Sequence, residues 1–212
     1  MLEYYKTLLA SRLTPRRWRH SQGVATYAVK LALRYGVSPD KAELAGWMHD
    51  YARDLPEQEL LALGEKAGLI GQEIEKRFPV LLHAPVGAWL LRTELGLEDE
   101  EILQAISRHT VGSPAMSPLD KIVYLADALE PGRQYPGVEE LRRLVEADLD
   151  GGLLKALESS IYYVLEKGHP LHPATVEARN YLLLKEEGRG WRRESERGGG
   201  AMAGGQNKGG LD

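Results

Sequence analysis

The stretch covering residues 42–53 constrains the fold most. Its apolar residues have the spacing of a helix, and they are followed by a histidine and an aspartate side by side at positions 49 and 50. Ala42, Ala45 and His49 share one stripe at helical spacing, and Asp50 lies on the adjoining stripe. The pair is therefore carried toward the interior. A single buried polar pair usually just finds hydrogen-bond partners in the core, so its meaning depends on the rest of the chain.

Helical spacing recurs along the chain, and no stretch shows the strict alternation of a strand. We expect one all-α domain over residues 1–187, since 212 residues with 43% hydrophobic content suffice for one sizeable core. Residues 64–80 are predicted to be a less regular connection. The predicted helices cover residues 2–11, 16–35, 39–50, 98–109, 118–129, 137–148 and 150–167, with others beginning near residue 56 and at His83 and a last one running through Leu184.

The composition changes at Gly188, because residues 188–212 hold nine of the 23 glycines and show no apolar periodicity. We predict a Gly-rich disordered tail there. This segment has five basic and three acidic residues, so the net charge of −4 leaves −6 for the remainder. A mildly acidic body argues against nucleic-acid partners, although it admits a local basic pocket for a small phosphate ligand.

Cysteine is absent, which excludes disulfides and thiolate ligands and leaves His, Asp and Glu to hold any metal. The first residues lack a basic segment followed by an apolar one, and no apolar run approaches the length of a membrane span. We therefore expect a cytoplasmic protein with no membrane partner. The sequence is silent on oligomeric state and is compatible with a homodimer.

Four histidines and two aspartates on five predicted helices lie where the apolar pattern predicts burial. An unpaired buried aspartate is strongly destabilising, so six such residues call for a compensating partner. A divalent metal is the economical common partner. The six residues are His20, His49, Asp50, His83, His109 and Asp127.

The order His, His-Asp, His, His, Asp in an all-helical chain resembles the HD-domain superfamily of metal-dependent phosphohydrolases, and within it the YqeK family. The resemblance spans about residues 12–184 and implies an HD-domain helical bundle with a metal site in its core. The His-Thr-x-Gly and Glu-Pro-x-Arg motifs are more specific than His-Asp alone. The matching segments are residues 17–21, 49–53, 82–88, 108–112, 124–127, 130–133 and 178–180.

By this resemblance, the chain is expected to be a symmetrical bis(5′-nucleosyl)-tetraphosphatase, which cleaves diadenosine tetraphosphate into two ADP at an iron-containing site. Asp50, His83 and His109 are then the catalytic residues. The number of metal ions, one or two, stays open, because His83 and His109 either complete a second metal site or contact the phosphate chain. Imidazole and carboxylate ligands suit iron or manganese and also accept cobalt or zinc. The implied ligands of the first ion are His20, His49, Asp50 and Asp127.

The expected reaction is in-line attack by a metal-activated hydroxide, with arginines neutralising the charge of four phosphates. Arg53 stands where the family often has lysine, which preserves charge but changes geometry. Residues 170–175 resemble a stretch that borders the nucleoside, or else form a helix-joining turn, and Arg16 and Arg19 are expected to be solvated. The predicted substrate-binding residues are Arg17, Asp50, Tyr51, Ala52, Arg53, His83, His109, Thr110, Asp127, Arg133, Pro170, Leu171, His172, Pro173, Ala174 and Thr175.

Two other functions stay open at this point. The same metal-binding pattern serves nucleotidases and deoxynucleotide triphosphohydrolases, which release nucleoside or tripolyphosphate from mononucleotides. A nucleotide-sensing module with negligible turnover is the alternative outside the enzymes. Analysis of the reaction products distinguishes these functions.

Overall fold

The computed structural model describes residues 2–197, with side chains through Lys185, and every regular element in that range is a helix. This confirms the all-α prediction. Across the described range, no helix is long and apolar enough to traverse a bilayer. The helices are α1 (Leu2–Arg12), α2 (Pro15–Tyr35), α3 (Pro39–Met48), α4 (Glu57–Lys66), α5 (Glu73–Arg77), η1, a 3-10 turn (Pro79–Leu82), α6 (His83–Leu95), α7 (Glu100–Arg108), α8 (Pro118–Leu129), α9 (Val138–Ala147), α10 (Leu149–Glu166) and α11 (Pro173–Arg197).

Local signals set several helix ends where the sequence predicts them. The Ser38 side chain accepts a hydrogen bond from the backbone of Lys41 and begins α3. Ser117 and Asp120 form a reciprocal capping box at the start of α8. Gly36 ends α2 in the left-handed conformation at φ 67°, which side chains with a Cβ rarely adopt.

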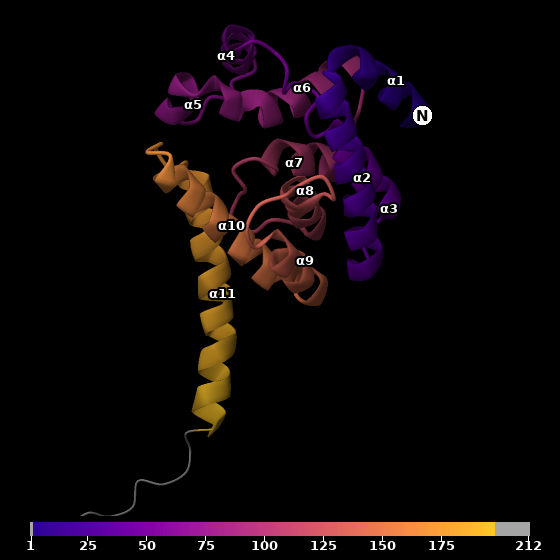
Figure 1. Cartoon of the computed structure of the whole chain (residues 1–212). Helices are drawn as coiled ribbons and strands as arrows, with labels where there is room; N and C mark the ends of the chain where they lie inside the picture. The colour runs from indigo at the N-terminus through magenta and orange to yellow at the C-terminus, as the bar shows by residue number, and fades with distance from the viewer. Residues whose placement is uncertain (1, 198–212) are drawn as a thin grey trace, which may run out of the picture.

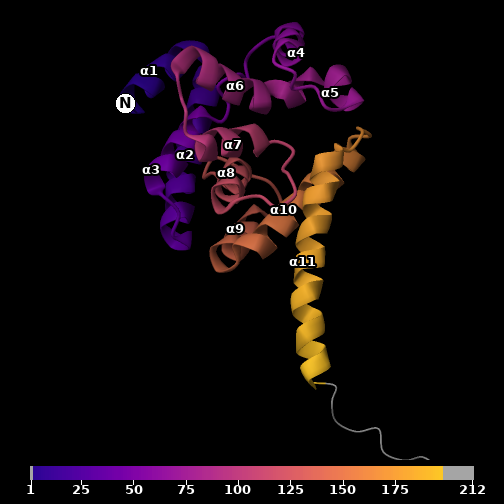
Figure 2. The same ribbon diagram turned by 180° about the vertical axis from the view of Figure 1, so that it is seen from behind.

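The core lies where α2, α3, α7 and α8 pack together, with α6 against α7 (Figures 1 and 2). Helices α2 and α3 approach so closely that a Cβ on Gly46 would lie 2.6 Å from the Cα of Ala25. This close approach brings the middle of α2 against the end of α3. Helices α10 and α11 lie on the opposite side of α7 and α8 from α2 and α3 (Figure 1).

Two segments differ from their predicted structure. The connection over residues 64–80 contains a short helix, α5, because Gln72 and Glu75 supply a local capping box. Helix α11 continues past Leu184 to Arg197 and so includes residues 188–197, for which the sequence predicts a disordered Gly-rich tail; the domain boundary at residue 187 stays a prediction. The lysine, glutamate and arginine residues around Gly188 are strong helix formers and outweigh its cost. The rest of the predicted tail, residues 198–212, lies outside the described residues.

Candidate metal centre

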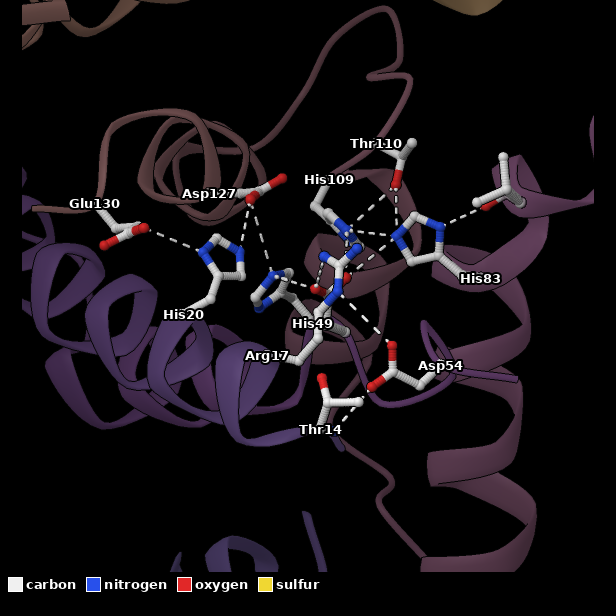
Figure 3. Close-up of polar contacts among 12 residues, drawn as sticks. Thr14, Arg17, His20, His49, Asp54, His83, His109, Thr110, Asp127 and Glu130 are labelled. Carbon is white, nitrogen blue, oxygen red and sulfur yellow. Dashed lines mark hydrogen bonds and ion pairs between the residues drawn. The ribbon is translucent and has the colours of Figure 1, made fainter. Parts of the chain in front are cut away.

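Four histidines direct one ring nitrogen, Nε2, into one elongated cluster that has His20 and His83 at its ends (Figure 3). Three of them are oriented in the same way, since Nδ1 donates to the backbone carbonyl three residues earlier. With Nδ1–H engaged, Nε2 carries the lone pair that a metal requires. The three bonds join His49 to Gly46 O at 2.8 Å, His83 to Val80 O at 2.5 Å, and His109 to Ile106 O at 2.7 Å.

The fourth histidine, His20 on α2, is held between two carboxylates (Figure 3). Its Nδ1 donates to Glu130 Oε1 at 3.2 Å, and its Nε2 lies 2.9 Å from Asp127 Oδ1. A Cβ on Gly23 would lie 2.5 Å from Glu130 Oε2, so this glycine makes room for the carboxylate. The sequence reasoning missed Glu130 as a site residue. The available signal was its place in the Glu-Pro-x-Arg motif.

Asp50 joins the two halves of the cluster through its two oxygens. Oδ1 lies 3.3 Å from His83 Nε2 and 3.9 Å from His109 Nε2. Oδ2 lies 3.6 Å from His49 Nε2 and accepts a hydrogen bond from Arg17 Nη1 at 3.0 Å. A carboxylate shared in this way is suited to bridging two adjacent cation positions.

Three arginines that the sequence predicts to bind phosphate lie near the cluster, and their contact with a substrate stays a prediction. Arg133 Nη2 lies 2.6 Å from Asp127 Oδ1, and Arg17 pairs with Asp50. Arg53 is half-buried, and the described part of the chain gives its guanidinium no ion-pair partner. Burial and the neighbouring Arg17 lower the pKa of Arg53. An anion is the partner that this guanidinium lacks.

The protonation states of the cluster suit metal ligation except at His20, where burial lowers the pKa but Asp127 outweighs it and raises the pKa, so Nε2 has to lose its proton to bind a metal. Burial, together with His49 and His83, lowers the pKa of His109 to about 3, so this imidazole is neutral at ordinary pH. Burial raises the pKa of the Asp127 carboxyl, but the hydrogen bond from His20 and neighbouring positive charges outweigh it and hold that pKa well below its usual range. Neutral imidazoles and ionised carboxylates are the forms that bind a divalent metal.

The cluster fits a divalent metal. Among the residues that the structure describes, His49 Nε2 is buried without a hydrogen-bond partner, and the Nε2 atoms of His83 and His109 face each other at 3.1 Å. A cation satisfies such converging acceptors. In three groups the ligand atoms all lie within 4.8 Å of one another, compatible with a central ion about 2.0–2.5 Å from each. The groups are His20, His49 and Asp50; His49, His109 and Asp127; and Asp50, His83 and His109.

Among the predicted substrate contacts outside the cluster and its arginines, Thr110 is the one whose side chain touches the cluster. Its Oγ1 lies 3.2 Å from Nε2 of both His83 and His109. Tyr51 behaves differently, because its side chain is 1% exposed and its hydroxyl accepts a hydrogen bond from Arg12 at 2.9 Å. Ala52 is also buried. The structure therefore does not bring the Tyr51 side chain to the cluster.

Residues 170–175 border the loop that follows His109. Thr175 Oγ1 donates to the carbonyl of Val111 at 2.9 Å, and His172 Nε2 lies 3.3 Å from Glu75 Oε1. The segment joins α10 to α11 and also lies beside the loop that carries Thr110. Its contact with a nucleoside stays a prediction.

The chain is similar to a known protein family and to named proteins of two bacteria. The HD domain family matches residues 17–132, a range that contains all six residues of the cluster. The chain is 43% identical over 180 residues to "Bis(5′-nucleosyl)-tetraphosphatase, symmetrical" of Halalkalibacterium halodurans, covering 85% of this chain and 96% of that protein. It is 39% identical to the protein of the same name from Bacillus subtilis, covering 81% and 92% of the two chains.

A solved structure shares the fold. It is described as a predicted HD superfamily hydrolase involved in NAD metabolism from Clostridium acetobutylicum. The TM-score is 0.85 at 39% sequence identity, and the match covers 87% of this chain and 98% of that one. The helical arrangement around the cluster is therefore that of an HD superfamily hydrolase.

Proposed function

Because this chain belongs to the HD-domain family and, within it, to the family of the symmetrical bis(5′-nucleosyl)-tetraphosphatases, we propose that it hydrolyses diadenosine tetraphosphate to ADP. One water is added across the central phosphoanhydride of the four-phosphate chain. Both products are then ADP, and the bond that breaks is the one between the second and third phosphates.

The observation that carries this proposal is the convergence of four imidazole nitrogens and two carboxylates beside arginines suited to phosphate. The buried, unpartnered Nε2 of His49 requires a cation, and the half-buried guanidinium of Arg53 requires an anion. A divalent metal and a polyphosphate satisfy both requirements at one place.

We propose iron as the metal, with manganese, cobalt and zinc as compatible ions and either one or two ions per chain. His20, His49, Asp50 and Asp127 would hold the first ion. Asp50 would also serve a second ion together with His83 and His109, two residues that lie with it in one ligand group. When bound, the metal supplies a water of lowered pKa and neutralises phosphate charge.

The protein residues then divide the remaining work. Arg53 and Arg133 bind phosphate oxygens, and Arg17 orients the Asp50 carboxylate that it contacts at 3.0 Å. In the one-metal case, His83 would be protonated at both ring nitrogens, with Nδ1–H on the Val80 carbonyl and the Nε2 proton available to the departing ADP oxygen. Thr110 fixes the spacing of the two imidazoles by contacting both Nε2 atoms.

We also propose that residues 1–187 act as one HD phosphohydrolase domain in the cytoplasm. The described helices pack around one core, and α11 continues beyond the proposed boundary to Arg197. A homodimer stays a prediction of the sequence. Size-exclusion chromatography with light scattering measures the oligomeric state.

The test is to incubate anaerobically purified, metal-quantified protein with diadenosine tetraphosphate and to separate the nucleotides by ion exchange. ADP as the sole product supports the proposal. ATP plus AMP would keep a metal hydrolase but reject symmetrical cleavage. With metal present, absence of product would favour another nucleotide substrate or a sensing role.

Two variants tie the activity to the centre. His49→Ala and Asp50→Ala are expected to lose metal and activity while keeping the helical circular dichroism of the wild type. Asp40→Ala is the matched control, because Asp40 is an exposed acid at the start of α3. Wild-type hydrolysis by metal-loaded, folded His49→Ala and Asp50→Ala proteins would show that the assignment is wrong.

A further inference from the structure

Two cavities of nearly equal volume, about 880 and 890 Å³, adjoin the metal centre and share Arg133 and Tyr135 in their walls. Each lies within the range of roughly 300–1,000 Å³ that is typical of sites for small molecules. We call the first the basic cavity, and its walls include Arg16, Arg17, Arg19, His20, Gln134 and Tyr135. The second lies against α8 and α10 and reaches His109 and Thr110.

The charge of the basic cavity is largely unneutralised. Its lining carboxylate, Glu130, is already engaged by His20 Nδ1 and by the backbone N–H of Gly132. Arg16 and Arg19 line the same space, and neither has an ion-pair partner among the residues whose side chains are described. Two free guanidiniums beside a single occupied carboxylate favour an anionic ligand.

The geometry of α2 joins these arginines to the centre. Arg16 lies four residues before His20, so the two side chains share one face of the helix, and Arg19 lies three residues after Arg16. His20 reaches Asp127 in the cluster at 2.9 Å. The basic cavity is therefore a direct extension of the metal centre.

The basic cavity lies at the opposite end of the centre from residues 170–175. That segment contacts the carbonyl of Val111, next to the His83 and Thr110 end, whereas the cavity adjoins His20 and Glu130. Figure 3 shows His20 and His83 at the two ends of the cluster. A substrate cut at its midpoint by this cluster has to extend in both directions, with one half on each side.

We propose that the basic cavity binds one nucleoside diphosphate half of the symmetrical substrate, and that Arg16 and Arg19 contact its phosphate oxygens. The inference rests on the proposed function, because it takes diadenosine tetraphosphate as the substrate. It replaces the expectation that these two arginines are merely solvated. The other half extends past Thr110 on the opposite side of the metal.

The test uses metal-loaded Arg16→Ala/Arg19→Ala protein, with Lys30→Ala/Arg34→Ala as the matched control. The control removes the same charge from the same helix, at a surface where both cations contact Glu146. The KM for diadenosine tetraphosphate is expected to rise about tenfold in the first variant and to stay unchanged in the control. Replacing both arginines by lysine is expected to recover part of the loss, since lysine keeps the charge but not the guanidinium fork.

Binding of ADP provides a readout that does not depend on turnover. Equilibrium dialysis is expected to give two ADP per wild-type chain and one per Arg16→Ala/Arg19→Ala chain. An unchanged KM together with equal ADP counts in both proteins would overturn the proposal and leave a solvated arginine pair. Wild-type protein that makes no ADP from diadenosine tetraphosphate would reject the proposed function alone, because the ADP count still tests the cavity.

Discussion

Helix α8 carries two acids in opposite surroundings: Asp120, in its first turn, is fully buried, and Asp127, two turns later, keeps 26% of its side chain exposed. Asp120 Oδ2 accepts hydrogen bonds from the backbone of Ser117 and the side chains of Gln104 and Arg108, at 2.8–3.0 Å. All of these partners are donors. Its other oxygen, Oδ1, is buried with no hydrogen-bond partner among the described residues, so the protein stabilises this carboxylate through the three donors on Oδ2.

Asp127 differs because acceptors as well as donors gather around it. Its Oδ1 contacts Arg133 and His20, while the unprotonated Nε2 of His49 lies 4.0 Å away without a partner of its own. Converging lone pairs repel one another unless a cation lies between them. The two acids differ in their neighbours: donors surround Asp120 Oδ2, whereas an unsatisfied acceptor of another residue, His49 Nε2, lies near Asp127, and a cation between them would satisfy both.

The most decisive test of this difference is Asp127→Asn, which removes the charge but keeps the size of the side chain. We expect kcat/KM for diadenosine tetraphosphate to fall at least about a thousandfold, well beyond the 10- to 100-fold typical of losing a group that merely supports a ligand. Metal content measured by elemental analysis should fall with it. A variant that retains both metal and wild-type turnover would place the centre elsewhere.

Glu130→Gln tests how strongly the His20 end depends on its supporting carboxylate. Glutamine keeps an oxygen near His20 Nδ1 but removes the charge that favours the ligating form of the ring. We expect metal affinity to fall about 10- to 100-fold, and excess metal to restore most of the activity. Metal titration of the apoprotein measures this. Glu146→Gln, on the surface of α9, is the control, and an equal effect in both variants would argue against a supporting role for Glu130.

The contrast also shows what the sequence predicts and what it leaves out. Apolar periodicity places His49 and Asp50 toward the interior correctly, because the buried face of a helix follows from its own residues. It does not reveal that Glu130 meets His20, since these residues are 110 positions apart and their contact depends on how α2 packs on α8. For the same reason, periodicity does not identify Asp120, whose partners Gln104 and Arg108 come from α7.

Exposed positions are harder still to predict. Arg16 and Arg19 are exposed, and sequence alone does not show that they line a cavity beside the metal centre. Tyr51 shows the converse, because it follows Asp50 directly and yet directs its hydroxyl toward Arg12. Adjacent residues on a turn project in different directions, so proximity in sequence to a ligand does not establish a side-chain contact.

Asp120→Asn is expected to have the reverse signature of Asp127→Asn. It leaves the Arg108 guanidinium without its counterion, although that side chain is 31% exposed and water compensates in part. We expect the free energy of unfolding of the apoprotein to fall by about 2 kcal/mol, with metal affinity and kcat unchanged. Urea denaturation measures the change. Loss of metal from the Asp120→Asn protein at unchanged stability would show that Asp120, like Asp127, supports the metal centre.

The smallest expected effect concerns the arginines, which repeat the same contrast. Arg108 is paired with Asp120 at 2.8 Å, whereas Arg53 has no ion-pair partner among the described side chains and is available to bind an anionic ligand. Arg53→Lys keeps the positive charge but loses the planar guanidinium, so we expect kcat/KM to fall only about threefold, mainly through KM.

Arg108→Lys is the matched control for Arg53→Lys and should lower the free energy of unfolding slightly without altering KM. Steady-state kinetics at two salt concentrations separates these cases, because a phosphate contact by residue 53 weakens as salt rises. Equal KM values for Arg53→Lys, Arg53→Ala and the wild type would show that this guanidinium does not bind the substrate.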